Sequence, residues 1–147
     1  MESTFKKAIA LLKEAGIEYK DITTPFWSDE YNGVVVPTIG KVIPLFQPTE
    51  DRKTWHEAMK LAEELGQQLP TVEEWHEIRR HRNVINELLA SKGGDTITAA
   101  DFWASTESYQ SYAWYVFFGS GVSYDTSKYN AYYCRPLAEF KGFDKEK

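Results

Sequence analysis

One helix-start signal occurs twice in this sequence, and it constrains the fold more than any other feature. Thr54-Trp-His-Glu57 and Thr71-Val-Glu-Glu74 each match a capping box, in which the threonine hydroxyl and the glutamate satisfy free amides at a helix start. Apolar residues at helical spacing follow each signal. The first set is Trp55, Ala58, Leu61, Ala62 and Leu65, and it ends at Gly66. The second begins with Trp75 and Ile78; Val84, Ile85, Leu88 and Leu89 either continue that helix or start it again before Gly93-Gly94. We therefore predict two helices.

The period of the pattern changes from helical to alternating after Phe102. In Ala113-Trp-Tyr-Val-Phe-Phe118, alternation predicts that Trp114, Val116 and Phe118 face the core, whereas Tyr115 and Phe117 look outward. Gly119 and Gly121 mark a turn, Val122 opens a return strand, and Arg135-Pro-Leu-Ala-Glu-Phe140 is predicted to be the final strand.

The N-terminal third predicts one further helix and two strands. Phe5, Ala8, Ile9, Leu12 and Ala15 indicate a helix near residues 4–15. Gly33-Val-Val-Val-Pro37 and residues 41–46 predict short strands of edge or irregular character, because proline cannot donate to a central ladder.

The fold class expected from these elements is α+β, with the helices packed on a small antiparallel sheet. The length of 147 residues fits one domain. We assign residues 1–140 to it, with the N-terminal helix and strands in 1–48 and the core in 49–140, followed by a polar tail at 141–147.

Charge and cysteine content exclude several classes of protein. A net charge of -5 argues against nucleic-acid binding, which needs clustered Lys and Arg. The short basic cluster of Arg79, Arg80 and Arg82 is predicted to be a solvated helix face. A single cysteine, Cys134, cannot form an internal disulfide and is expected to be buried.

No stretch resembles a secretory signal or a membrane span, so we expect no membrane insertion. The final location stays open, and a virion or a cell surface is among the possibilities.

Residues 108–133 are unusually rich in two residue types. Seven tyrosines and five serines fall within these 26 residues. Tyrosine gives a large amphipathic contact at low entropic cost, and serine gives adaptable hydrogen bonding, which is why antibody paratopes favour the pair. Strand propensity would explain some of the tyrosines, but not those among Ser, Asn and Gly in the predicted turns. The composition therefore favours a binding surface.

Three motifs occur in order around this segment: Leu69-Pro-Thr-Val-Glu-Glu-Trp75, Trp103-Ala-Ser-Thr-Glu107, and Ala113-Trp-Tyr-Val followed by Lys128 and Tyr133-Cys-Arg-Pro-Leu137. Together they resemble the C-type-lectin-fold variable proteins of diversity-generating retroelements, a formylglycine-generating-enzyme-like branch found in gut bacteria and their phages. The resemblance covers roughly residues 54–140. It implies a C-type-lectin-like fold that carries a hypervariable ligand-binding surface.

In such proteins template adenines are randomised, and asparagine codons become codons that never encode Lys, Glu, Gln, Met or Trp. The positions that we predict to be variable and to bind ligand are Ser108, Tyr109, Ser111, Tyr112, Tyr115, Phe117, Ser120, Ser123, Tyr124, Asp125, Thr126, Ser127, Tyr129, Asn130, Ala131 and Tyr132. None of these sixteen is one of the five excluded types, which make up 30 of residues 1–107. Gln110 departs from the pattern.

The same resemblance implies a fixed scaffold: Trp103, Ser105, Thr106, Glu107, Ala113, Trp114, Val116, Phe118, Lys128, Arg135 and Pro136. Glu107 and Arg135 are expected partners in a structural ion pair.

Catalytic and metal-binding alternatives find little support in the sequence. The oxidases of the formylglycine-generating branch use two cysteines, whereas this chain has one. The motifs of calcium-dependent lectins are missing, and His76 and His81 stand five apart rather than the four that a zinc-protease helix needs.

We therefore expect a binder of a protein or other macromolecule, with no enzymatic activity, no cofactor and no metal. Its oligomeric state stays open. The alternative is a structural or adhesive tip protein of a phage or cell-surface fibre, in which the same segment lies in a subunit interface.

Overall fold

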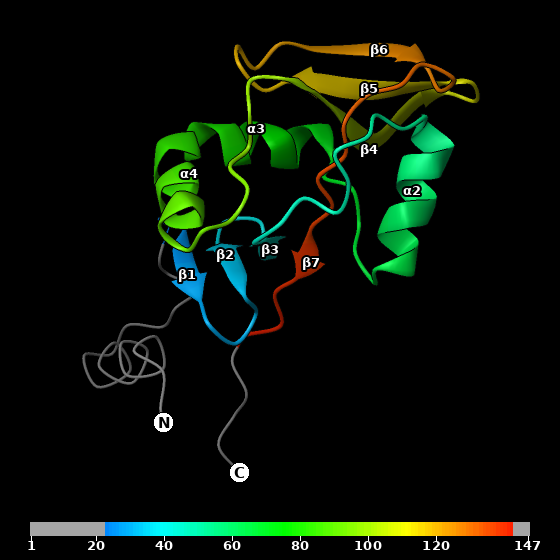
Figure 1. Ribbon diagram of the computed structural model, residues 1–147. Coiled ribbons are helices and arrows are strands. Elements are labelled where there is room, and N and C mark those ends of the chain that lie inside the picture. The colour runs from blue at the N-terminus through cyan, green and yellow to red at the C-terminus, as the bar shows by residue number, and fades with distance from the viewer. Residues whose placement is uncertain (1–22, 143–147) are drawn as a thin grey trace.

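Two antiparallel sheets lie on opposite sides of a layer of helices in the computed structural model, which describes residues 23–142 (Figure 1). The elements in chain order are β1 (Phe26–Ser28), β2 (Gly33–Val36), β3 (Lys41–Pro44), α2 (Trp55–Glu64), α3 (Val72–Arg80), α4 (Arg82–Ser91), β4 (Asp101–Tyr109), β5 (Tyr112–Phe117), β6 (Ser123–Ser127) and β7 (Ala138–Glu139). The described part of the chain is therefore α+β. The helix predicted near residues 4–15 lies outside it.

One sheet has the strand order β1-β2-β3-β7, and the other has the order β4-β5-β6. The prediction of edge or irregular strands is wrong for β2 and β3, which occupy the middle of the first sheet, with Val34 and Ile43 fully buried. The prolines do not interrupt the ladder, because Pro37 follows β2 and Pro44 is the last residue of β3.

Both predicted capping boxes are confirmed. The threonine side chain accepts a hydrogen bond from the glutamate amide at the start of α2 and of α3, and each glutamate accepts one from its threonine amide. The tryptophan near each helix start is buried and fastens its helix to β4: the indole of Trp55 donates to the Ala104 carbonyl at 2.9 Å, and that of Trp75 to the Trp103 carbonyl at 3.1 Å.

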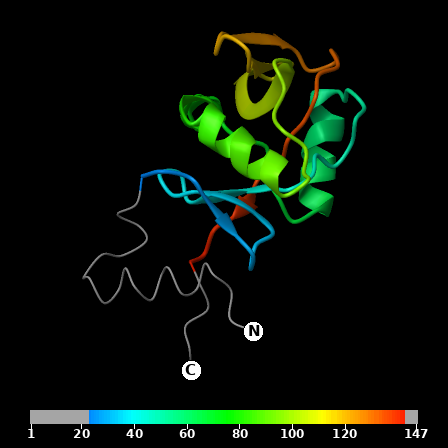
Figure 2. The ribbon, with the colours of Figure 1, turned by 60° about the vertical axis from the view of Figure 1, so that its left-hand side comes forward.

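The second predicted helix is in fact two helices, which corrects the expected number. His81 has φ -105° and ψ 21°, so it ends α3 and begins α4. Because of this break the two helices pack against different sheets: α3 packs against β4 and β5, whereas α4 packs against β1 and β2. Figure 2 shows the helices between the two groups of strands from a second direction.

Two apolar clusters form the core. The larger joins both sheets through α3 and α4, and it includes Trp75, Phe102 and Val116; the smaller joins α2 to β4 and β5 around Trp103. The predicted final strand is much shorter than expected, since only Ala138 and Glu139 pair with β3. The preceding residues are buried, and Leu137 instead exchanges backbone hydrogen bonds with Gln68.

Candidate functional site

The sixteen residues predicted to bind ligand all lie in the β4-β5-β6 sheet, its connections and the loop that follows, at the top of Figure 1. Nine are exposed (109, 111, 112, 117, 120, 124, 129, 130 and 131), and seven are partly exposed (108, 115, 123, 125, 126, 127 and 132). None of the sixteen is buried. The structure thus brings together side chains that are separated by up to 24 positions, 132 minus 108, at one end of the molecule.

In and just after β5, the predicted scaffold residues Trp114, Val116 and Phe118 alternate with these positions and face inward. Val116 and Phe118 are buried, and Phe118 meets the Trp75 ring of α3 edge-on at 5.8 Å. Trp114 packs against the same cluster and is partly buried. The predicted inward face of β5 is therefore confirmed.

The prediction that Tyr115 looks outward from β5 is corrected by its packing against other aromatic rings. Its ring stacks on that of Tyr132 at 4.5 Å and 14°, and Tyr132 in turn meets Trp103 edge-on at 4.9 Å. Burial raises the pKa of the Tyr115 phenol above its ordinary value, and the Tyr132 phenol adds to the increase. Tyr115 is only partly exposed because residues 132–134 fold back over this face of the sheet.

The exposed aromatic side chains form two groups rather than one flat surface. Tyr109 and Tyr112 are cross-strand partners whose rings meet edge-on at 6.2 Å, and they lie on one face of the β4-β5 hairpin tip. Phe117 and Tyr124 lie on the other face, because Phe117 is two residues from Tyr115 and Tyr124 pairs with it. Tyr129, 81% exposed, projects from the loop after β6.

Lys128 fastens this surface to the scaffold. Its side chain is buried, and the ammonium donates to Glu107 Oε2 at 2.6 Å and to the Gln110 carbonyl at 2.8 Å. The same ammonium lies 4.2 Å from the centre of the Trp55 ring, and the Lys128 carbonyl accepts from the Trp55 amide. One cation therefore joins the β4-β5 hairpin, the end of β6 and the start of α2.

Arg79 holds the β5-β6 turn, a role that the sequence did not indicate. Its guanidinium donates to the carbonyls of Phe118 and Gly119 at 2.9 and 3.0 Å, so the prediction of a solvated basic face is wrong for this residue. Gly121 has φ +82°, and an added Cβ there would lie 3.1 Å from the Arg79 side chain. The turn therefore needs glycine for its backbone and for the close approach of the arginine.

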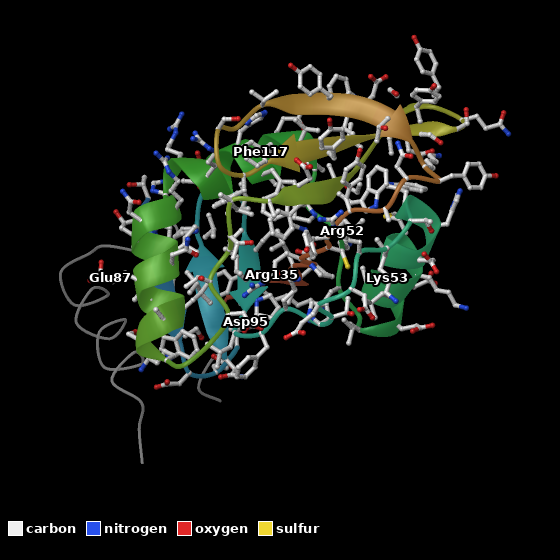
Figure 3. The ribbon with its side chains drawn as sticks, turned by 45° about the horizontal axis from the view of Figure 1, so that its top comes forward. Arg52, Lys53, Glu87, Asp95, Phe117 and Arg135 are labelled. Carbon is white, nitrogen blue, oxygen red and sulfur yellow. The ribbon has the colours of Figure 1, made fainter. Side chains whose placement is uncertain are left out.

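The expected Glu107–Arg135 ion pair does not form. Glu107 pairs with Lys128, whereas Arg135 is fully buried and donates from Nη2 to the Pro44 carbonyl at 2.9 Å. Among the described residues neither Nε nor Nη1 of Arg135 has a hydrogen-bond partner. Burial lowers the pKa of Arg135 to about 10, and the charge of Asp95 opposes this decrease. Figure 3 shows Arg135 inside the molecule near Asp95, away from Phe117 on β5.

Residues 23–142 contain no group of three or more His, Cys, Asp or Glu side chains that could hold a metal ion. Cys134 is buried, as predicted, and burial raises the pKa of its thiol to about 11. A cleft of about 800 Å³ lies beside α2, lined among others by His56, Lys60 and Glu74, and none of the sixteen predicted residues lines it.

In the described residues no helix is both long and apolar enough to span a bilayer. Comparison with models of known families and with curated proteins found no match to this chain.

Proposed function

We propose that this protein is a diversified ligand-binding protein of the retroelement type, with a C-type-lectin-like scaffold that displays residues 108–133. One observation carries the proposal. All sixteen predicted variable positions are at least partly exposed, while Ala113, Val116, Phe118 and Lys128 between them are buried. A division of this kind is what repeated replacement of surface side chains requires.

The energetic reason is the different cost of substitution at the two sets. Exposed substitutions cost within about 0.5 kcal/mol, whereas removing a large buried side chain costs several kcal/mol. A scaffold fixed by Trp75, Trp103 and Val116 can therefore carry many different side chains at the nine exposed positions.

The ligand we propose is a protein or other macromolecule. Tyr109, Tyr124 and Tyr129 are 59–81% exposed, and exposed aromatic side chains supply much of the binding energy in protein interfaces. The net charge of -5 does not favour nucleic acid. We propose no catalytic role, cofactor or metal; a metal or flavin bound to the purified protein would contradict this part of the proposal.

The second candidate function is a structural or adhesive tip, in which the same surface packs between subunits. The exposure of Tyr129 and Tyr124 favours it equally, because subunit interfaces are also rich in aromatic side chains. The two candidates differ in whether these tyrosines contribute to the stability of the isolated protein.

Joint replacement of Tyr109, Tyr124 and Tyr129 by serine separates the two candidates. A ligand-binding surface predicts a melting temperature and a molecular mass in solution equal to those of the wild type. A subunit interface predicts a smaller assembly or a lower melting temperature. Tyr133→Ser is the matched control: this tyrosine packs against the larger core cluster, so its replacement should lower the melting temperature in either case.

A further inference from the structure

We propose that the outer edge of β6 binds an extended segment of a protein ligand, which adds a strand to the β4-β5-β6 sheet. The inference rests on the proposed function and specifies how part of the ligand is held. In such binding, main-chain hydrogen bonds supply affinity and neighbouring side chains supply specificity.

The register of β5 and β6 fixes which backbone groups face outward. The Phe117 amide donates to the Val122 carbonyl, and the Lys128 amide donates to the Ser111 carbonyl. Because hydrogen-bonded pairs alternate in an antiparallel ladder, residues 122, 124, 126 and 128 face β5, while Ser123, Asp125 and Ser127 point their amides and carbonyls away from it. No hydrogen bond within residues 23–142 uses the backbone groups of Ser123 or Asp125.

The other long edge of this sheet is covered. On β4, the Trp103 amide donates to the Tyr133 carbonyl and the Ser105 amide donates to the Pro70 carbonyl. The edge strands of the second sheet, β1 and β7, have only three and two residues. β6 has five residues and no proline, lysine or bulge, and Asp125 is its one charged side chain.

The charge on β6 argues for a different protein rather than a second copy of this chain. Asp125 is the one acidic residue of β6, and its carboxylate accepts a hydrogen bond from the Ser108 hydroxyl at 2.9 Å. Two copies paired antiparallel about Asp125 would place the two carboxylates opposite each other, which is unfavourable. A ligand strand with Lys or Arg opposite Asp125 would be attracted.

The position of this edge also suits a diversified surface. Backbone groups at 123 and 125 stay the same for every side chain except proline, so a strand pairing survives most diversification. Tyr124, 59% exposed, lies between them on the opposite face of the strand and could contact the ligand's side chains, which would set its specificity.

The test compares Asp125→Pro with Asp125→Ala, because both remove the carboxylate but only proline removes the outward amide. The probe is a phage-displayed library of short linear peptides selected on the wild-type protein. We expect enriched peptides that carry Lys or Arg and bind the proline variant at least about tenfold more weakly than the alanine variant. Equal affinities, or no enrichment of any peptide, would overturn the inference.

A second measurement does not depend on the proline variant folding. Amide hydrogen exchange at Ser123 and Asp125 of the wild type should slow when a selected peptide binds, and unchanged exchange at both would also overturn the inference. If the two Asp125 variants bind equally but the triple serine variant of Tyr109, Tyr124 and Tyr129 loses binding, the edge inference fails and the proposed function stands. If no change within residues 108–133 affects binding, the proposed function fails as well.

Discussion

Replacement of Lys128 by methionine should destabilise the protein although the change conserves the size of the side chain. Methionine retains the apolar stem and removes the ammonium, which donates to Glu107 at 2.6 Å and to the Gln110 carbonyl at 2.8 Å and lies 4.2 Å from the Trp55 ring centre. Lys128 belongs to the predicted scaffold, so its loss should affect the fold of the surface and not only its chemistry.

The expected loss can be worked from these contacts. Hydrogen bonds to charged groups contribute about 1.5–3 kcal/mol each, and a cation over an aromatic ring about 0.5–2 kcal/mol. The Glu107 side chain is 53% exposed, so water replaces much of what it loses. We therefore expect a decrease of about 2–3 kcal/mol in the free energy of unfolding, or roughly 5–10 °C in Tm for a chain of this size.

Urea unfolding and calorimetry measure both quantities, and Lys92→Met is the matched control. Lys92 also lies over a tryptophan, 5.2 Å from the Trp27 ring centre, but it is exposed, so its loss should cost under about 0.5 kcal/mol. Equal effects of the two substitutions would refute the conclusion that Lys128 fastens the surface to the scaffold.

Further predictions concern three places in the molecule: the Tyr115–Tyr132 pair, Cys134 and Arg135. Tyr115→Ser and Tyr132→Ser should be coupled by about 0.5–1.5 kcal/mol in a double-mutant cycle, because their rings stack; additive effects would contradict the stack. The Cys134 thiol should resist thiol reagents at pH 8 until the protein unfolds. Since burial raises its pKa from 9.0 to about 11, stability should fall between these pH values, where only the unfolded chain loses the proton, and Cys134→Ala should lessen that fall. Arg135→Met should destabilise less than Arg135→Ala in thermal unfolding, because both remove the buried charge but only methionine fills most of the buried volume; the reverse order would contradict this.

Local signals allowed most of the helices and the second sheet to be predicted. The capping boxes at Thr54 and Thr71 involve residues within one helical turn, and the alternation in β5 reflects its direct contact with α3. Both features can therefore be predicted from the sequence. The break at His81 has no local sequence signal, because it depends on α3 and α4 packing against different sheets. The central position of β2 depends on its pairing with β1 and β3. The neighbouring prolines, Pro37 after β2 and Pro44 at the end of β3, made both strands resemble edge strands in the sequence.

The candidate site likewise has features that the sequence predicts and features that it does not predict. Exposure at positions such as Tyr109 and Tyr129 follows from their polar and turn-forming neighbours. The partners of Glu107, Arg135 and Arg79 are set by long-range packing: Lys128 is 21 residues from Glu107, and Phe118 is 39 residues from Arg79. The stack of Tyr115 on Tyr132 likewise depends on the chain folding back over the sheet.

The most direct test of a diversified binding surface is the DNA sequence beside the gene. A diversified surface of this type requires a near-copy of the codons for residues 103–140 that differs from the gene only at adenines of the copy, next to a gene for a reverse transcriptase. Those differences should fall on the sixteen predicted positions and spare the codons for Trp114, Val116 and Lys128. A neighbourhood without such a copy, or a copy whose differences fall on the buried scaffold codons, would contradict the account.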